Sequence, residues 1–326
     1  MPHLLLVATG GTIAGSAADS SDTAHYRAAA LSAETLLAAL PEAASIGSVS
    51  AEQLFALDSK NMQPAHWLAL AQRLRERIAD PAIDGIVLTH GTDTLEETAF
   101  FLHLTLPRSK PIVLTAAMRP ATARSADGPM NLLQAFACAA QPEAAAHGPL
   151  VAAGDRIWRA RDCRKRHSHA PDALGGIECG PVASAIGTSI QFEAAAPATA
   201  PRFGGALATA LPRVDVICAY AGAPADLLEA SVERDAKALV LALTGHGSVP
   251  DDWLPAIAAA RAAGIAVVRA SRVMAGGVAP QANFDDAAHG TLVCGRLSPW
   301  QARIVLMLGI AQGHDALQLQ ADLLGA

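Results

Sequence analysis

The sequence has no stretch close to the ~20 uncharged apolar residues that a bilayer crossing requires. Its hydrophobic fraction of 52% and its mean hydropathy of +0.28 derive in large part from alanine. It also lacks a marked excess of cations, since its formal net charge is −6 and basic residues crowd only at positions 159–166. We therefore expect neither a membrane nor a nucleic acid as a partner.

Cysteine pairs and phosphate-binding fingerprints are absent as well. The cysteines are odd in number and contain no CxxC pair, which argues against a zinc or redox site and predicts buried free thiols. They are Cys138, Cys163, Cys179, Cys218 and Cys294. Neither GxGxxG nor GxxxxGK[ST] occurs, which argues against a dinucleotide-binding oxidoreductase. We expect no cofactor and no metal.

The first residues do not resemble a secretory leader. Met1, Pro2 and His3 run directly into the apolar residues 4–7, without a basic region, a long apolar region or a small-residue cleavage site. This start predicts a cytoplasmic location. A periplasmic location would instead require a leader that precedes this sequence.

At 326 residues the chain exceeds the ~250–300 residues at which single cores stop growing, so we expect two domains. Short β-branched or leucine-rich runs alternate with longer runs of helical period, which is typical of parallel sheets covered by helices. The sequence predicts strands over 3–9, 85–89, 111–115 and 150–153, and helices over 33–40, 64–78, 95–106 and 129–140. These form a larger N-terminal catalytic domain, residues 1–192.

Residues 193–211 are rich in Ala, Pro and Gly without a clear period, which predicts a linker. The alternation then resumes, with strands predicted over 214–219, 238–243 and 266–270 and helices over 253–263 and 299–311. The predicted fold class is therefore α/β with two domains, each a mostly parallel sheet flanked by helices. The smaller C-terminal domain spans residues 212–326.

Two segments at predicted strand ends carry hydroxyl groups. The first, TGGTIAG at 9–15, contains two glycines that permit a sharp turn close to a ligand, and places Thr12 after the first strand. A nucleotide phosphate is the alternative ligand for such a turn. The second, HGTDTLEET at 90–98, contains Thr92 and Asp93; here Asp93 or Thr94 is alternatively a simple helix cap. Because the carboxyl ends of strands in such a sheet converge, Thr12 and Thr92 are expected to face one ligand.

These two segments resemble the paired segments of bacterial-type L-asparaginases. The resemblance extends over essentially the whole chain, because further runs follow in the family's order and spacing. They are Ser59 with Asn61 and Met62, AAMRP at 116–120, SADGP at 125–129 with Asn131, Gly180-Pro181, and SRV at 271–273.

The resemblance implies a catalytic role for five residues. Thr12 matches the nucleophile that forms an acyl-enzyme, and an aliphatic hydroxyl must surrender its proton as it attacks. Tyr26 matches the tyrosine that contacts this threonine, although a surface anchor is its alternative interpretation. Thr92, Asp93 and Lys165 match the group that moves protons. Lys165 lies in a basic run, so a solvated surface charge is the alternative, and acting as a base at neutral pH requires a lowered pKa.

The resemblance also implies the substrate-binding groups. Ser59, with the backbone at Gly91 and Thr92, is expected to bind the α-carboxylate of the substrate, and Asp93 its α-ammonium group. Two positions depart from the family: Lys60 stands where periplasmic relatives carry Gln, and Asn283 stands where a neighbouring subunit usually supplies Glu. Ser248 matches the adjacent Asn or Ser position. Loss of the negative charge at Asn283 is expected to weaken ammonium binding and alter the preference between asparagine and glutamine.

The implied assembly is a homotetramer in which neighbouring subunits complete each other's sites, and the implied substrate is L-asparagine, with L-glutamine as a second amide. The bridging cysteines of the periplasmic type would lie near Ala79 and Arg108, and neither position holds cysteine. The absence of this disulfide favours a reducing compartment. Two alternatives stay open: a glutaminase-asparaginase, and an amino-acid sensor without turnover. The start of the sequence at the first strand argues against an amidotransferase subunit with an extra N-terminal domain.

Overall fold

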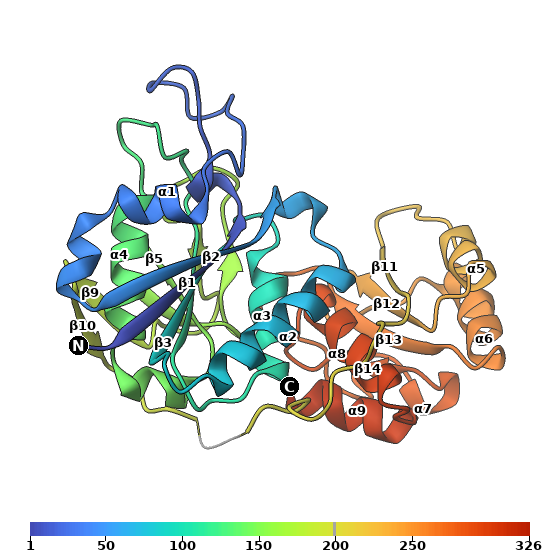
Figure 1. The fold of residues 1–326 in the computed structure, drawn as a ribbon. Coiled ribbons are helices and arrows are strands. Elements are labelled where there is room, and N and C mark those ends of the chain that lie inside the picture. Colours follow the sequence, from blue (N-terminus) through green and yellow to red (C-terminus); the bar gives the residue numbers. More distant parts are fainter. Residues whose placement is uncertain (198–199) are drawn as a thin grey trace. The chain divides into compact units, whose positions relative to one another are not determined.

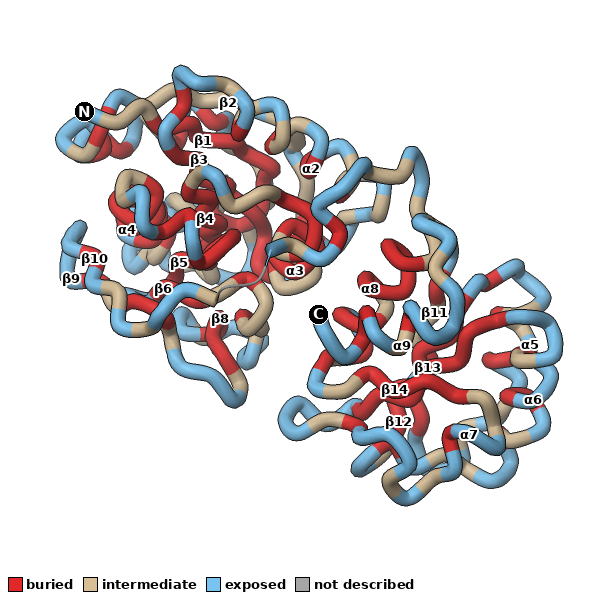
Figure 2. The backbone as a smooth tube through the Cα atoms, turned by 90° about the horizontal axis from the view of Figure 1, so that it is seen from below, coloured by how far each residue is buried: buried red, intermediate tan, exposed pale blue. Residues whose placement is uncertain are grey.

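The computed structural model describes residues 1–197 and 200–326, and the chain divides into two compact units, Met1–Leu207 and Ala208–Ala326. The predicted linker, residues 193–211, spans this division, and its residues 198–199 lie outside the described residues. Buried residues concentrate on the strands and the inner helix faces of each unit (Figure 2). Each unit therefore has a hydrophobic core of its own.

The N-terminal unit is built on an eight-stranded sheet of order β10-β9-β6-β5-β4-β3-β1-β2 (Figure 1). Strands β2, β1, β3, β4 and β5 are parallel, whereas β6, β9 and β10 are antiparallel additions at one edge. The strands are β1 (His3–Gly10), β2 (Ser48–Leu57), β3 (Gly85–Thr89), β4 (Ile112–Thr115), β5 (Leu150–Ala153), β6 (Arg156–Arg159), β9 (Ala183–Ile186) and β10 (Ser189–Phe192). A separate pair joins β7 (Arg164–Lys165) to β8 (Leu174–Gly175).

Helices cover both faces of this sheet. They are α1 (Ala33–Ala38), α2 (Pro64–Ala79), α3 (Leu95–Thr105) and α4 (Gly128–Ala139). Helix α4 packs on β3, β4 and β5, and its Phe136 joins Leu4, Leu6 and Val87 in one buried cluster. On the other side, α2 and α3 contact each other through Trp67 and Phe101, whose rings stack at 5.6 Å. Strands buried on both faces read as continuous apolar runs, which explains why the sequence predicted β1, β3, β4 and β5.

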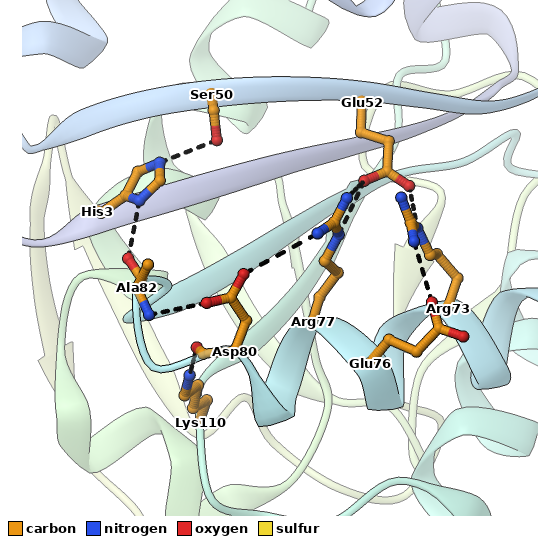
Figure 3. A network of polar contacts seen from close by, with 9 residues as sticks. All are labelled: His3, Ser50, Glu52, Arg73, Glu76, Arg77, Asp80, Ala82 and Lys110. Carbon is orange, nitrogen blue, oxygen red and sulfur yellow. Dashed lines mark hydrogen bonds and ion pairs between the residues drawn. The ribbon is translucent and has the colours of Figure 1, made fainter.

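Ion pairs tie the edge strand β2 to α2 (Figure 3). The Glu52 carboxylate accepts from Arg73 Nε and, at 2.7 Å, from Arg77 Nη2, and both arginines lie on α2. At the start of β1, the His3 ring contacts Ser50 Oγ at 2.9 Å and the Ala82 carbonyl at 2.8 Å. These polar contacts hold a half-buried strand for which the sequence offered no clear alternation.

The C-terminal unit has a four-stranded parallel sheet of order β11-β12-β13-β14. Its strands are β11 (Val214–Cys218), β12 (Ala238–Leu243), β13 (Ala266–Ser271) and β14 (Leu292–Val293). Its helices are α5 (Asp226–Glu233), α6 (Leu254–Ala262), α7 (Asp286–His289), α8 (Pro299–Ala311) and α9 (Ala316–Gly325). Trp253 and Ile257 pack with Leu239 and Leu241 in its core, while α8 packs against β11, β12 and β13.

The predicted fold class is confirmed: both units are α/β, with a larger sheet in the N-terminal unit. The sequence did not predict β2, the strands β6–β10, or helices α5, α7 and α9, because these elements are short or lack a strong apolar period. The prediction of buried thiols is wrong at Cys179 and Cys218, which are exposed, although all five cysteines are free. Within residues 1–197 and 200–326, no helix combines the length and apolar character that a membrane crossing requires.

Candidate active site

The strand order of the N-terminal sheet reverses between β1 and β3. The chain leaves β1 toward β2 on one side and returns to β3 on the other, so the strand order 2-1-3-4-5 reverses direction between β1 and β3. In open α/β sheets, ligands bind outside the carboxyl ends of strands at such a reversal. Thr12 follows β1 and Thr92 follows β3, so both hydroxyls lie at this edge.

The loop after β1 and the loop after β3 touch at Gly11 and Gly91. Gly10 and Gly11 have φ of 106° and 85°, a region that favours glycine. A Cβ atom on Gly11 would lie 2.4 Å from the Gly91 nitrogen, so a side chain there is excluded. Thr12 and Thr92, which directly follow Gly11 and Gly91, therefore lie on loops that touch.

Thr12 is directly hydrogen-bonded to Tyr26. Its Oγ1 lies 2.7 Å from the Tyr26 hydroxyl oxygen, and Thr12 itself is buried. Tyr26 is held in place because the neighbouring Arg27 pairs with Ser16 through two backbone hydrogen bonds of 2.9 and 3.0 Å. The tyrosine is thus a partner of the Thr12 hydroxyl rather than a surface anchor.

Lys165 connects Thr92 and Asp93. Its Nζ donates to Thr92 Oγ1 at 2.9 Å and to Asp93 Oδ1 at 2.6 Å, and its side chain is only 17% exposed. Its backbone N–H donates to Glu96 Oε2 at 2.8 Å, which anchors β7 to the first turn of α3. This geometry contradicts the alternative of a solvated surface lysine.

Glu96, which accepts the hydrogen bond from the Lys165 backbone N–H, is not among the site residues predicted from the sequence. Burial raises the pKa of the Glu96 carboxyl, against the opposing effects of the Lys165 N–H and the nearby Arg164 and Lys165 cations. The side chain also borders a pocket of about 460 Å³ that is lined by Asp93, Lys165, Arg166, His167 and Ser168. Glu96 belongs to the HGTDTLEET segment, which the sequence did single out. A negative charge in the first turn of a helix is favourable in any protein, so the residue type alone did not point to a role in the site.

Ser59 packs beside this cluster, whereas Lys60 faces solvent. A Cβ atom on Gly91 would lie 2.6 Å from Ser59 Oγ, so the serine packs directly against the Gly91 backbone. Thr94 Oγ1 donates to the Ser59 carbonyl at 2.8 Å and holds the short turn that bears the serine. Lys60 Nζ pairs with Asp58 at 2.8 Å; this hydrogen bond and charge raise the pKa of the Lys60 amine.

Within the C-terminal unit, Ser248 and Asn283 are brought together. Asn283 Nδ2 donates to Ser248 Oγ at 3.1 Å, and both residues are exposed. Asn283 has a φ of 54°, so a tight loop presents its side chain. The two residues that the sequence predicted for substrate binding thus form one exposed pair within the C-terminal unit.

Fold and site together define a class of protein: an α/β enzyme whose sheet edge carries two threonine hydroxyls, one bonded to a tyrosine and the other to a lysine that also pairs with a carboxylate. Family models agree with this class. Residues 3–198 match the model described as asparaginase, N-terminal, and residues 213–322 match the glutaminase/asparaginase C-terminal domain. The chain belongs to the asparaginase family.

Individual relatives are similar over nearly the whole chain. The chain is 39% identical to L-asparaginase 2 of Bacillus subtilis, over 98% of this chain and 86% of that protein. It is 36% identical to a probable periplasmic L-asparaginase of Haemophilus influenzae, over 98% and 92% of the two chains. The crystal structure of a probable cytoplasmic L-asparaginase from Campylobacter jejuni superposes with a TM-score of 0.94, at 35% identity and full coverage of both chains.

Proposed function

We propose that this protein hydrolyses the side-chain amide of L-asparagine to L-aspartate and ammonia, with Thr12 as the nucleophile. The observation that carries the proposal is the pairing of two hydroxyl groups at one sheet edge: Thr12 bonded to Tyr26, and Thr92 bonded to Lys165. The relatives named L-asparaginase support the choice of substrate.

In the first half of the reaction, Thr12 Oγ1 attacks the amide carbon and the C–N bond breaks. The hydroxyl proton is passed on and reaches the departing nitrogen, which leaves as ammonia, while an ester forms on Thr12. In the second half, water attacks the ester carbon, its proton returns to Thr12, and aspartate is released. The net change is one asparagine and one water to one aspartate and one ammonia.

The proton transfers are assigned to the groups that flank the two hydroxyls. Tyr26, 2.7 Å from Thr12 Oγ1, orients the attacking hydroxyl. Lys165 bonds to Thr92 Oγ1 at 2.9 Å and to Asp93 Oδ1 at 2.6 Å, so a proton can pass between the amine and the threonine hydroxyl without rearrangement. Acid–base assistance of this kind contributes ~10²–10⁴-fold to the rate.

Substrate binding is assigned to groups around the same edge. Ser59 and the backbone N–H of Gly91, which pack against each other, receive the α-carboxylate, and Asp93 receives the α-ammonium group. The pair formed by Ser248 and Asn283 approaches from a neighbouring subunit of a homotetramer, which supplies the second ammonium contact.

A glutaminase-asparaginase is the second candidate. The neutral side chain of Asn283 favours it. Asparagine and glutamine differ in the distance between the α-ammonium group and the side-chain amide, and a site that holds the ammonium group with one negative charge fewer discriminates less between these distances. We also propose a cytoplasmic location. All five cysteines are free thiols, which suits a reducing compartment, and cell fractionation tests this location.

Ammonia release from asparagine and glutamine, measured on the wild type and on Thr12→Ala, tests the function. We expect turnover by the wild type and its near-complete loss in Thr12→Ala. Thr9→Ala is the matched control, since it removes a buried hydroxyl of the same segment that donates to the Thr89 carbonyl at 2.7 Å. Binding of asparagine without ammonia from the wild type would identify a sensor instead.

A further inference from the structure

A buried histidine lies directly behind the Gly91–Thr92 peptide. His90 is fully buried; its Nδ1 lies 2.7 Å from the Gly91 carbonyl oxygen and its Nε2 lies 3.0 Å from Thr98 Oγ1. Thr98 in turn lies 3.0 Å from Trp67 Nε1. These contacts join α2, α3 and the loop after β3 in one chain of hydrogen bonds.

The donor and the acceptor of each of these hydrogen bonds follow from the chemical groups involved. A carbonyl oxygen only accepts, so His90 Nδ1 must donate to Gly91. Burial lowers the pKa of His90 to about 4, despite the hydrogen bond to Gly91, so the ring is neutral and its Nε2 is an acceptor. The Thr98 hydroxyl therefore donates to His90 Nε2, and the Trp67 N–H, which is only a donor, supplies the remaining bond to Thr98.

The direction of the Gly91–Thr92 peptide follows from these bonds. The peptide is trans, as are all peptides within the described residues, so its C=O and N–H point in opposite directions. With the Gly91 carbonyl held against the buried His90 ring, the Thr92 N–H points away from the core. Close packing of Gly91, where a Cβ atom would lie 2.6 Å from Ser59 Oγ, leaves little room for another orientation.

We propose that Trp67, Thr98 and His90 form a positioning relay that aims the Thr92 N–H at the substrate amide oxygen as negative charge develops on it. The inference rests on the proposed function of Thr12 and Thr92. His90 is a positioning residue rather than a catalytic one, because it touches neither the nucleophile nor its proton-transfer group. A donor that is fixed before reaction costs no reorganisation during it, and this is how such sites accelerate acyl transfer.

The test compares Thr98→Val with Thr98→Ser. Valine keeps the shape of threonine but cannot donate to His90 Nε2, whereas serine keeps the hydroxyl and loses a methyl group. We expect kcat of Thr98→Val to fall by ~10- to 100-fold with little change in KM, since complete loss of one oxyanion donor costs ~10²–10³-fold. Thr98→Ser should stay within about threefold of the wild type, because it preserves the donor.

Thr105→Val is the matched control. Thr105 is also buried on α3, but its hydroxyl donates at 2.8 Å to the Phe101 carbonyl of its own helix. We expect Thr105→Val to lower the melting temperature without lowering kcat. Crystal structures of the two Thr98 variants provide a readout independent of turnover: the Gly91 carbonyl should leave His90 in Thr98→Val and stay in Thr98→Ser.

The outcomes separate this inference from the proposed function. A wild type that releases no ammonia removes the function, and the orientation of the Gly91–Thr92 peptide in Thr98→Val then still decides whether the relay exists. If Thr98→Val has the same kcat as Thr105→Val and its Gly91–Thr92 peptide has not moved, the relay is overturned while the proposed function stands. If Thr98→Val does not fold, Thr98→Cys, whose thiol is a weak donor, should lie below Thr98→Ser in kcat; equal values would contradict the inference.

Discussion

Arg269 and Asp286 form a buried two-point ion pair in the C-terminal unit, with Nε to Oδ1 at 2.6 Å and Nη2 to Oδ2 at 2.7 Å. The pair also binds the backbone of two loops, one at Gly247 and one at Gln281. Arg269 Nη1 donates to the Gly247 carbonyl at 2.7 Å, and the Gln281 N–H donates to Asp286 Oδ2 at 2.8 Å. These loops carry Ser248 and Asn283, so the ion pair sets the surface that we assign to a neighbouring site.

Replacement of Asp286 with Asn should be strongly destabilising. It leaves the guanidinium of Arg269, which is 0% exposed, without a countercharge, and breaking one partner of a buried pair costs ~3–5 kcal/mol of unfolding free energy. Denaturant unfolding measures this loss. Asp235→Asn, which breaks an exposed pair with Lys237, is the control and should have little effect.

The same pair predicts a loss of stability in acid. Burial alone would raise the pKa of Asp286, but hydrogen bonds from Arg269, Thr291 and the Gln281 N–H lower it below its ordinary value. A depressed pKa stabilises the folded state above the unfolded-state pKa of ~4, and this contribution is lost as the pH falls through the folded pKa. Unfolding free energies measured below pH 5 should fall more steeply in the wild type than in Asp286→Asn; parallel curves would contradict this assignment.

Replacement of Lys165 with Met should remove most of the turnover while leaving the fold intact. The variant loses the donor to Thr92 and Asp93, and we expect kcat to fall by ~10²–10⁴-fold, the usual range for one acid–base group. Steady-state ammonia release gives the value. Lys237→Met, at an exposed lysine of the C-terminal unit, is the control, and a Lys165→Met enzyme as active as this control would remove Lys165 from the proton path.

Asn283→Glu should tighten substrate binding. It introduces a carboxylate beside Ser248, and a charged hydrogen bond exceeds a neutral one by ~1 kcal/mol, so KM for asparagine should fall about fivefold. Gln281→Glu adds the same charge two residues away and is the matched control. If neither KM nor the asparagine-to-glutamine ratio changes in Asn283→Glu, Asn283 has no part in ammonium binding.

Glu52→Gln should weaken the N-terminal unit without changing its chemistry. The Glu52 side chain is 17% exposed and accepts from two arginines of α2 that are themselves about one-third exposed. Its neutralisation should therefore cost ~1–2 kcal/mol of unfolding free energy, the low end for hydrogen bonds between charged groups. Chemical unfolding measures the effect, with kcat expected to stay at the wild-type value. Glu76→Gln is the control, because Glu76 contacts only Arg73 of this pair and is half exposed; an equal loss in both variants would show that β2 does not depend on Glu52.

Much of the fold was predictable because it depends on local pattern. The strands β1, β3 and β12 are continuous apolar runs, and the helix α2 begins with Pro at its first turn and buries one apolar stripe. Strand β2 escaped prediction because its half-buried residues are held by ion pairs with α2, which are distant in sequence. The roles of the predicted site residues stay predictions until the variants above are measured.

The sequence by itself determined the residue types at the strand ends: the glycines before Thr12, the hydroxyl and carboxylate of Thr92 and Asp93, and the family to which their order belongs. Only the tertiary structure decided which of these groups meet. The burial of Lys165 against Glu96, the contact of Gly11 with Gly91, and the neutral His90 donating to Gly91 all join distant segments or depend on the exclusion of water. Local patterns report on neighbours along the chain, whereas hydrogen-bond partners and burial are set by packing between elements.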